Sequence, residues 1–214
     1  MNTKISENLN RILTFAKKYN PTIIAVTKYH TVNEMKEVYE AGLNNFGENR
    51  VIDAIEKINL LEEEIASNSH YHLIGHLQSN KVNRAVGFFD LIHSVDSYEL
   101  AGKINDVAKQ KGIVQKILIQ VNNAHEEQKF GIAPSQLESL INDVSGLENI
   151  SLEGLMTMAP LTDDTVLIGK LFCEMRQLKD KYDLKELSMG MSNDYKIALE
   201  EGATMIRLGR ILFE

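Results

Sequence analysis

The sequence predicts a (β/α)8 barrel, in which eight parallel strands close into a ring and helices cover its outside. Two observations predict this fold class. Short runs rich in β-branched residues alternate with longer amphipathic stretches along the chain, which is the pattern of βαβ units and a parallel sheet. Eight strand candidates occur in the 214 residues, and eight is the number that a closed barrel of this type needs. An open parallel sheet is the alternative.

The chain is expected to form one domain over residues 1–214. It contains only three prolines, and no segment rich in glycine, in serine or in charge of one sign interrupts the alternation. A chain of this length buries roughly 70% of the surface of its unfolded form, which is enough for one substantial core.

The composition argues against several classes of protein. The chain has an ordinary globular content of 43% hydrophobic and 25% charged residues. Its net charge of −7 is opposite in sign to the positive charge of a surface that binds nucleic acid. No stretch is continuously apolar over the length of a signal peptide or a membrane span. The single cysteine, Cys173, fits a reducing compartment. We therefore expect a soluble, cytoplasmic protein with no nucleic-acid or membrane partner.

The strand candidates are short apolar runs. The second and the seventh are weak by composition and are included because of their place in the series. In chain order the candidates are Thr22–Tyr29, Asn44–Asn49, Tyr71–Gly75, Leu91–Val95, Lys116–Asn122, Ser151–Met158, Glu186–Met189 and Met205–Phe213.

The helix candidates have apolar residues at helical spacing. The last strand candidate runs almost to the C-terminus, so no helix is expected after it. We expect the amphipathic segment Ile5–Tyr19 to fill the place of the missing eighth helix. The other helix candidates are Thr31–Gly42, Val51–Ile65, Ser97–Lys111, Pro134–Val144, Ile168–Tyr182 and Ser192–Glu201.

Two candidate functional residues lie at the ends of strands one and two, because the sites of (β/α)8 barrels lie at the C-terminal ends of the strands. Lys28 ends strand one and can act as a general base or as an imine-forming nucleophile. The alternative is a solvated loop lysine. Asn49, at the end of strand two, offers an amide to a ligand or caps the next helix, and the two roles are compatible.

The ends of strands seven and eight predict an anion site. Ser192 stands at a predicted helix start, where free N–H groups and the helix dipole favour an anion. Ordinary helix capping is the alternative for this serine. Gly209 and Arg210 belong to the stretch MIRLGR of strand eight, and barrels often hold a phosphate between the loops after strands seven and eight.

Arg207 is predicted to point into the barrel. Ile206 and Leu208 alternate with it along strand eight, so the arginine and its neighbours belong to opposite faces. A guanidinium buried there needs a partner. That partner is either a carboxylate, Glu48 or Glu153, or a bound ligand.

A metal site is not expected. His72 and His76 are four residues apart, a spacing that would bring both rings to one face of a helix. However, His72 lies in a strand pattern that Gly75 interrupts, and the other histidines supply no third ligand at a suitable spacing. We interpret Cys173 as structural.

A lysine on strand one, an anion site after strands seven and eight and an inward arginine on strand eight together suit pyridoxal 5′-phosphate (PLP). The sequence resembles the pyridoxal phosphate homeostasis protein family, which are single-domain relatives of the N-terminal barrel of bacterial alanine racemases. The matching stretches appear in family order and cover nearly the whole chain. They are AVTK (25–28), NFGEN (45–49), HLIGHLQSNK (72–81), KFGI (129–132), GLMTMAP (154–160), LSMGMSND (187–194) and MIRLG (205–209).

The resemblance implies a role for each candidate residue. Lys28 is implied as the lysine that forms an imine, or Schiff base, with PLP, and Asn49 as a neighbour of the cofactor. Arg207 is implied to face the pyridine nitrogen. The residues implied around the phosphate are Met191, Ser192, Gly209 and Arg210.

Three features depart from the family pattern. His76 stands where the family usually has proline, and Arg210 replaces a usual small hydroxyl residue. The chain also stops at Glu214, slightly short of the usual C-terminal tail.

The resemblance implies a cofactor-handling protein of vitamin B6 homeostasis rather than an enzyme. The expected partners are PLP and the apo-enzymes that would receive it, and a monomer is expected. An amino-acid racemase is the alternative, although the racemase relatives use a further β-domain that brings a second acid/base residue. A lysine-imine aldolase is a third candidate, but such enzymes generally place the lysine on strand six, where Ser151–Met158 contains none.

Overall fold

A computed structural model describes residues 3–124, 126, 128 and 130–214 of the chain. These residues form a closed barrel of eight parallel strands that neighbour one another in chain order. The predicted fold class is therefore confirmed. The strands are β1 (Thr22–Val26), β2 (Asn45–Glu48), β3 (His70–Leu73), β4 (Leu91–Val95), β5 (Gln115–Gln120), β6 (Ile150–Met156), β7 (Glu186–Ser188) and β8 (Met205–Leu208).

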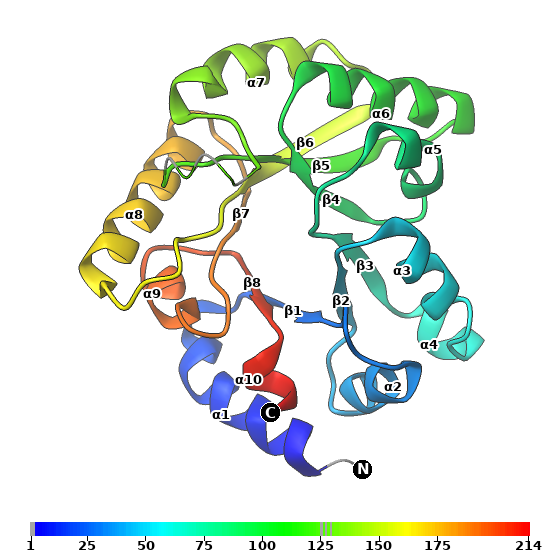
Figure 1. Cartoon of the computed structure of the whole chain (residues 1–214), viewed down its shortest axis with the longest axis vertical. Helices are drawn as coiled ribbons and strands as arrows, with labels where there is room; N and C mark the ends of the chain where they lie inside the picture. Colours follow the sequence, from blue (N-terminus) through cyan, green and yellow to red (C-terminus); the bar gives the residue numbers. More distant parts are fainter. Residues whose placement is uncertain (1–2, 125, 127, 129) are drawn as a thin grey trace.

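Helices surround the barrel in an outer ring (Figure 1). No helix in the described part of the chain is long and apolar enough to cross a membrane. The α-helices are α1 (Thr3–Ala16), α2 (Val32–Glu40), α3 (Val51–Ile58), α4 (Glu63–Ser67), α5 (Val82–Ala85), α6 (Tyr98–Lys111), α7 (Leu137–Ser145), α8 (Thr165–Lys181), α9 (Tyr195–Glu200) and α10 (Arg210–Phe213), and the 3₁₀ helices are η1 (Lys17–Tyr19), η2 (Ser79–Lys81) and η3 (Pro134–Gln136).

The end of the chain differs from the prediction. The last strand stops at Leu208, and the short helix α10 follows it, so the expectation of no helix after strand eight was wrong. The backbone turns at Gly209, which has a φ of −111° and a ψ of −96° and cannot continue the strand. Helix α1 packs beside α10, and the Asn8 side chain donates a hydrogen bond to the Leu212 carbonyl at 3.0 Å. The two helices therefore cover this side of the barrel together.

Other elements differ at their ends. Strand β1 stops at Val26, so Lys28 lies in the turn that follows it. The predicted helix Val51–Ile65 is divided into α3 and α4 by a break at residues 59–62. The helix predicted from Ser192 begins at Tyr195. Local propensity places such ends only approximately, because capping and tertiary contacts decide the last turn.

The strands separate two groups of buried side chains. Ile206 and Leu208 belong to the large core between the strands and the helices. Met205 packs with Ile24, Leu91, Leu118 and Met156 in a smaller cluster inside the barrel. The inside of the barrel also contains buried polar groups, among them His72, His93, Ser188 and Arg207. The predicted inward direction of Arg207 agrees with this alternation.

Candidate functional site

Lys28 lies in the turn after β1, at the C-terminal end of the barrel, and its side chain is exposed. Its Nζ atom is 4.8 Å from the centre of the Tyr29 ring, which is itself 86% exposed. The base of the turn is fixed, because the Thr27 amide donates to the Gly47 carbonyl and the Thr27 hydroxyl donates to Glu48 at 2.6 Å. An accessible amine therefore stands on a rigid support.

A buried ion pair lies under this turn. Glu48 is 2% exposed, and its carboxylate is 2.6 Å from Nζ of Lys57 on α3. Lys57 also donates to the Thr27 carbonyl at 2.6 Å. These contacts join β1, β2 and α3 directly below Lys28. They also show that the partner of Glu48 is Lys57 rather than Arg207.

Asn49 lines a pocket of about 420 Å³ beside the ends of β2 and β3. A side chain at Gly75 would approach the Asn49 carbonyl to 2.3 Å, so glycine is required where the two loops touch. The N-cap of α3 is Arg50, without a side-chain capping bond, so the alternative role of Asn49 as a helix cap is not observed. His76 and Lys81 line the same pocket.

The loops after β7 and β8 are joined by side chains. The Ser192 hydroxyl accepts a hydrogen bond from the Ile211 amide at 3.2 Å, and Arg210 donates to the Asn193 side chain at 2.9 Å. Ser192 lies in the turn before α9, whose N-cap is Asp194, so its predicted place at the helix start was wrong. Ser192, Gly209 and Arg210 are nevertheless brought together, as predicted from the strand ends.

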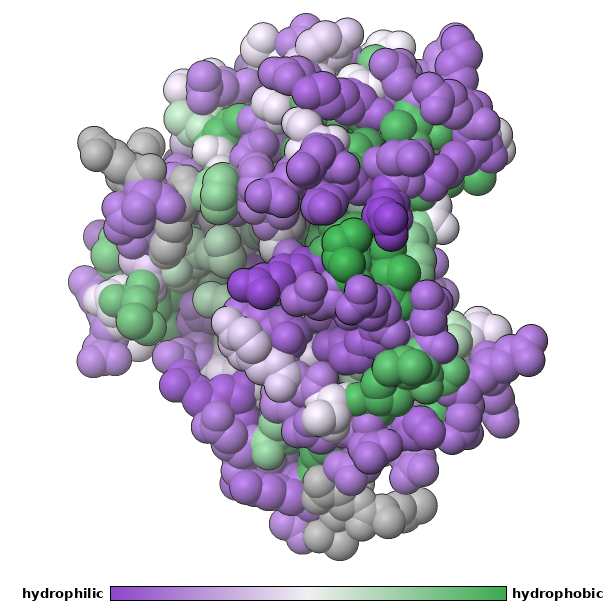
Figure 2. Space-filling view, turned by 45° about the vertical axis from the view of Figure 1, so that its right-hand side comes forward, coloured by the Kyte–Doolittle hydropathy of each residue, from purple (hydrophilic) through white to green (hydrophobic). Residues whose placement is uncertain are grey.

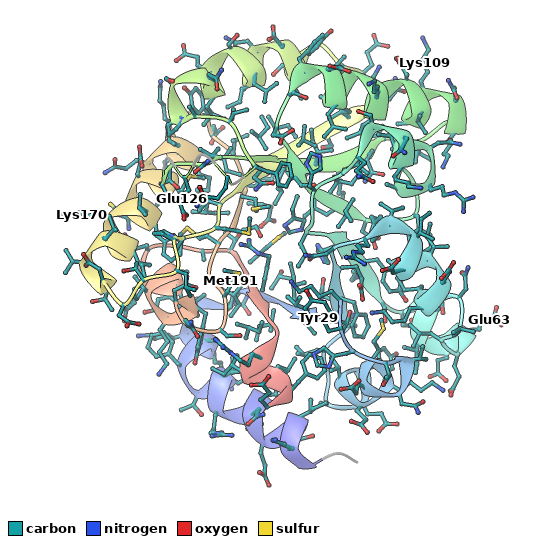
Figure 3. The ribbon with its side chains drawn as sticks, in the orientation of Figure 1. Tyr29, Glu63, Lys109, Glu126, Lys170 and Met191 are labelled. Atoms are coloured by element: carbon teal, nitrogen blue, oxygen red, sulfur yellow. The ribbon has the colours of Figure 1, made fainter. Side chains whose placement is uncertain are left out.

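Met191 and Tyr29 lie on the two sides of β8 (Figure 3). Met191 is 38% exposed, and its amide donates to Asp194 Oδ1 at 2.5 Å. The turn that carries Lys28 also contacts α10, because the rings of His30 and Phe213 are stacked with centroids 3.5 Å apart. The lysine and the joined loops thus belong to one connected end of the barrel.

Arg207 is 3% exposed inside the barrel. It donates to the Ser188 hydroxyl at 2.6 Å and to the Thr157 carbonyl at 2.8 Å. The alternative ion pair with Glu153 is not observed, since that carboxylate accepts a hydrogen bond from Ser151. Burial lowers the pKa of Arg207 to about 10, which still leaves the guanidinium protonated at neutral pH.

His72 and His76, which are four residues apart in the sequence, have different surroundings. His72 is buried inside the barrel, whereas His76 stacks on Phe130 with ring centroids 4.0 Å apart. No group of three or more histidine, cysteine or carboxylate side chains that could hold a metal is found among the described residues. Lys129, at the start of the KFGI stretch, lies outside the described residues.

A series of buried, hydrogen-bonded polar side chains beside Arg207, here called the buried polar chain, was not predicted from the sequence. His93 contacts the Ser188 hydroxyl through Nδ1 at 3.0 Å and His72 Nδ1 through Nε2 at 3.0 Å. His72 Nε2 in turn contacts the Asn45 side chain at 3.0 Å. The period-two alternation of the strands indicates which residues face inward, but it does not indicate that these polar groups meet.

Comparisons with known proteins show the family of this chain. The family described as alanine racemase, N-terminal domain, matches residues 2–214. A protein named pyridoxal phosphate homeostasis protein from Aquifex aeolicus is 37% identical over 213 residues, which cover 97% of this chain and 87% of the relative. The chain belongs to the pyridoxal phosphate homeostasis protein family.

Several solved structures share the fold of this chain. PipY of Synechococcus elongatus PCC7942, in its structure without PLP, is 38% identical with a TM-score of 0.90, covering 98% of this chain and 100% of PipY. The structure of PipY with PLP bound is 37% identical over the same shares, with a TM-score of 0.87. An alanine racemase of Clostridium difficile 630 shares the fold, with a TM-score of 0.80 at 18% identity, covering 99% of this chain and 56% of the racemase.

The buried His72 predicts an acid-sensitive step in stability. Burial lowers the pKa of His72 from 6.5 to about 4. As the pH falls, His72 is therefore protonated in the unfolded chain before it is protonated in the folded protein. The stability that its neutral ring contributes to the folded state is complete above about pH 6.5 and is lost as the pH falls toward 4. The free energy of unfolding, measured by urea denaturation, should decrease through this window by about 3 kcal/mol because of His72.

The His72→Asn variant is the control for this prediction. Asparagine keeps an acceptor near the position of Nδ1 and does not titrate. The variant should be less stable at neutral pH and should lose this part of the pH dependence. Parallel pH curves for the two proteins would contradict the assignment of the step to His72.

Proposed function

We propose that this chain binds PLP through a covalent imine bond to Lys28 and serves cytoplasmic cofactor homeostasis without appreciable turnover. One observation carries the proposal. An exposed lysine on a rigid turn lies at the same barrel end as the joined loops after β7 and β8. Relatives named for PLP homeostasis and the PLP-bound structure of PipY support the choice of cofactor.

The joined loops fit a phosphate group. In the described part of the chain, the backbone N–H groups of Ser192 and Arg210 donate to no other residue, so they are free to bind an anion. The Arg210 guanidinium adds a positive charge and further N–H donors. Ser192 and Asn193 fix the two loops to each other, which holds these donors in place before a ligand arrives.

Lys28 is proposed to provide the covalent link, because bound PLP supplies an aldehyde that condenses with a primary amine. The exposure of Lys28 and of the neighbouring Tyr29 keeps this link accessible to an incoming amine. That access suits storage and release, and apo-enzymes that need the cofactor are the proposed recipients. We propose that the chain acts as a monomer. This proposal is supported by the face of the molecule in Figure 2, which is mainly hydrophilic.

Arg207 is proposed to face the pyridine nitrogen and to limit turnover. A guanidinium donates hydrogen bonds and does not give up its proton near neutral pH. The ring nitrogen would then accept a hydrogen bond and remain unprotonated, which makes the ring a poor electron sink. Binding is therefore supported more strongly than carbanion chemistry at an amino acid.

Lys28 should carry the cofactor. After loading with PLP and reduction with borohydride, peptide mass mapping should find the pyridoxyl group on Lys28. Lys28→Ala should lose both the label and the visible absorption band. Lys18→Ala is the matched control, because Lys18 Nζ also lies over a tyrosine ring, 4.6 Å from the centre of Tyr19. A Lys28→Ala protein that is still fully coloured would refute the assignment.

The phosphate should be bound by the joined loops. Each charge-assisted hydrogen bond contributes about 1.5–3 kcal/mol, so Ser192→Ala or Arg210→Ala should weaken PLP binding by about 10- to 150-fold. Pyridoxal, which lacks the phosphate, should bind nearly as well as before. Equal losses for the two ligands in an absorbance titration would place the anion site elsewhere.

The PLP-loaded protein should show racemase and transaminase rates near background. The visible band should nevertheless respond to added amino acids, because the link to Lys28 can exchange with another amine. Racemisation is measured by chiral chromatography of alanine and other amino acids. A robust rate that Lys28→Ala abolishes would favour the racemase alternative.

A further inference from the structure

The buried polar chain crosses the inside of the barrel from one end to the other. It starts at Asn45, the first residue of β2, and reaches Thr157, the residue after β6, through Arg207. Two further asparagines extend it at the first end. Asn45 Nδ2 contacts Asn44 Oδ1 at 3.0 Å, and Asn44 Nδ2 contacts the Asn68 carbonyl at 3.0 Å.

Two groups of this polar chain, one at its first end and one next to its last member, have only one possible hydrogen-bonding role. The Asn68 carbonyl can only accept, and the Arg207 guanidinium can only donate. Asn44 must therefore donate to Asn68 through its Nδ2, which leaves its Oδ1 to accept from Asn45. The Oδ1 of Asn45 must then accept from the Nε2–H of His72.

The same reasoning fixes the protons of the two histidines. Burial lowers the pKa of His72 to about 4 and that of His93 well below 6.5, so both rings are neutral and carry one proton each. His72 has its proton on Nε2, so its bare Nδ1 accepts from the Nε2–H of His93. The bare Nδ1 of His93 then accepts from the Ser188 hydroxyl. The Ser188 oxygen is left to accept from Arg207 at 2.6 Å.

We propose that His93, acting through Ser188, is the positioning residue that holds Arg207 as a fixed donor toward the ring nitrogen of the cofactor. The proposal rests on the function proposed above. His93 keeps the Ser188 proton directed away from Arg207, so the serine lone pairs face the guanidinium. The Thr157 carbonyl holds a second nitrogen of Arg207. Its remaining N–H groups are thereby set in direction before the ligand binds.

Loss of the acceptor at His93 should release this arrangement. Without it the Ser188 proton has no acceptor among the described residues of the polar chain, and it competes with Arg207 for the space between the two side chains. Arg207 then keeps its charge but loses its fixed place. A residue that restores an acceptor at the position of Nδ1 should restore the place of Arg207.

The first test needs no cofactor. NMR of the ¹⁵N-labelled histidine rings at neutral pH should show both His72 and His93 protonated on Nε2 and bare on Nδ1. Ser188→Ala removes the hydrogen-bond donor to Nδ1 of His93 and should therefore change the ¹⁵N chemical shift of that atom. The shifts of His76, which does not belong to the polar chain inside the barrel, should stay unchanged. A proton on Nδ1 of His93 would overturn the proposed direction.

The second test uses the PLP-loaded protein. His93→Leu and Ser188→Ala should weaken PLP binding by about tenfold and shift the visible band, while His93→Asn, whose Oδ1 replaces the Nδ1 acceptor, should stay within about twofold of the unmodified protein. Urea denaturation of each variant identifies any variant that fails to fold. If His93→Leu does not fold, the PLP affinity and visible band of Ser188→Ala, which is the smallest change, test the proposal. Folded variants with unchanged affinity and band would overturn the proposal.

The two proposals fail in different ways. If the unmodified protein forms no visible band and Lys28 is not labelled, the proposed function fails, and the role of His93 toward the ring nitrogen fails with it. If Lys28 is labelled normally but the variants of His93 and Ser188 behave like the unmodified protein, only the positioning role is wrong.

Discussion

The inside of this barrel depends on how the protein solvates the buried guanidinium of Arg207. A buried cation without acceptors would be very unfavourable, because burial removes the water that hydrates it and nothing would replace that water. Ser188 on β7 and the Thr157 carbonyl after β6 supply two acceptors. Because Ser188 accepts from Arg207, its own proton goes to His93, and the direction of each further hydrogen bond follows. One charge thus orders a path of neutral polar groups across the barrel.

Closure of the barrel brings the two halves of the candidate site together. The first and last strands are paired in parallel, with Ile24 opposite Arg207 and Ala25 opposite Leu208. The turn that carries Lys28 therefore leaves the barrel beside the loop after β8. The stacked rings of His30 and Phe213 add a contact between this turn and α10. Residues from opposite ends of the sequence therefore lie side by side in the candidate site, because the closed sheet has no edge.

The local predictions succeeded where a side-chain pattern decides the structure and failed where capping does. Alternation around Arg207 placed it correctly inside the barrel, and the strand ends correctly located Lys28 and the Ser192 and Arg210 pair. Ser192 was expected at a helix start, and capping a helix was the alternative role for Asn49. In the structure the helices begin later, at Tyr195 and after Arg50, and the Ser192 hydroxyl accepts from Ile211 instead. Short polar residues have many alternative partners, so their sequence context does not select one.

The sequence by itself determined the fold class, from the alternation and number of its segments, and the inward face of β8, from the period-two pattern around Arg207. It also predicted the end of the barrel at which the candidate site lies, because such barrels carry their sites at the C-terminal ends of the strands. Only the tertiary structure decided that α10 follows the last strand and that Glu48 pairs with Lys57. It also decided the partners of His93, whose contact with Ser188 joins positions 95 residues apart. Such a hydrogen bond requires that β4 and β7 bring the His93 Nδ1 atom and the Ser188 hydroxyl within 3.0 Å of each other inside the barrel, and no local pattern contains that distance.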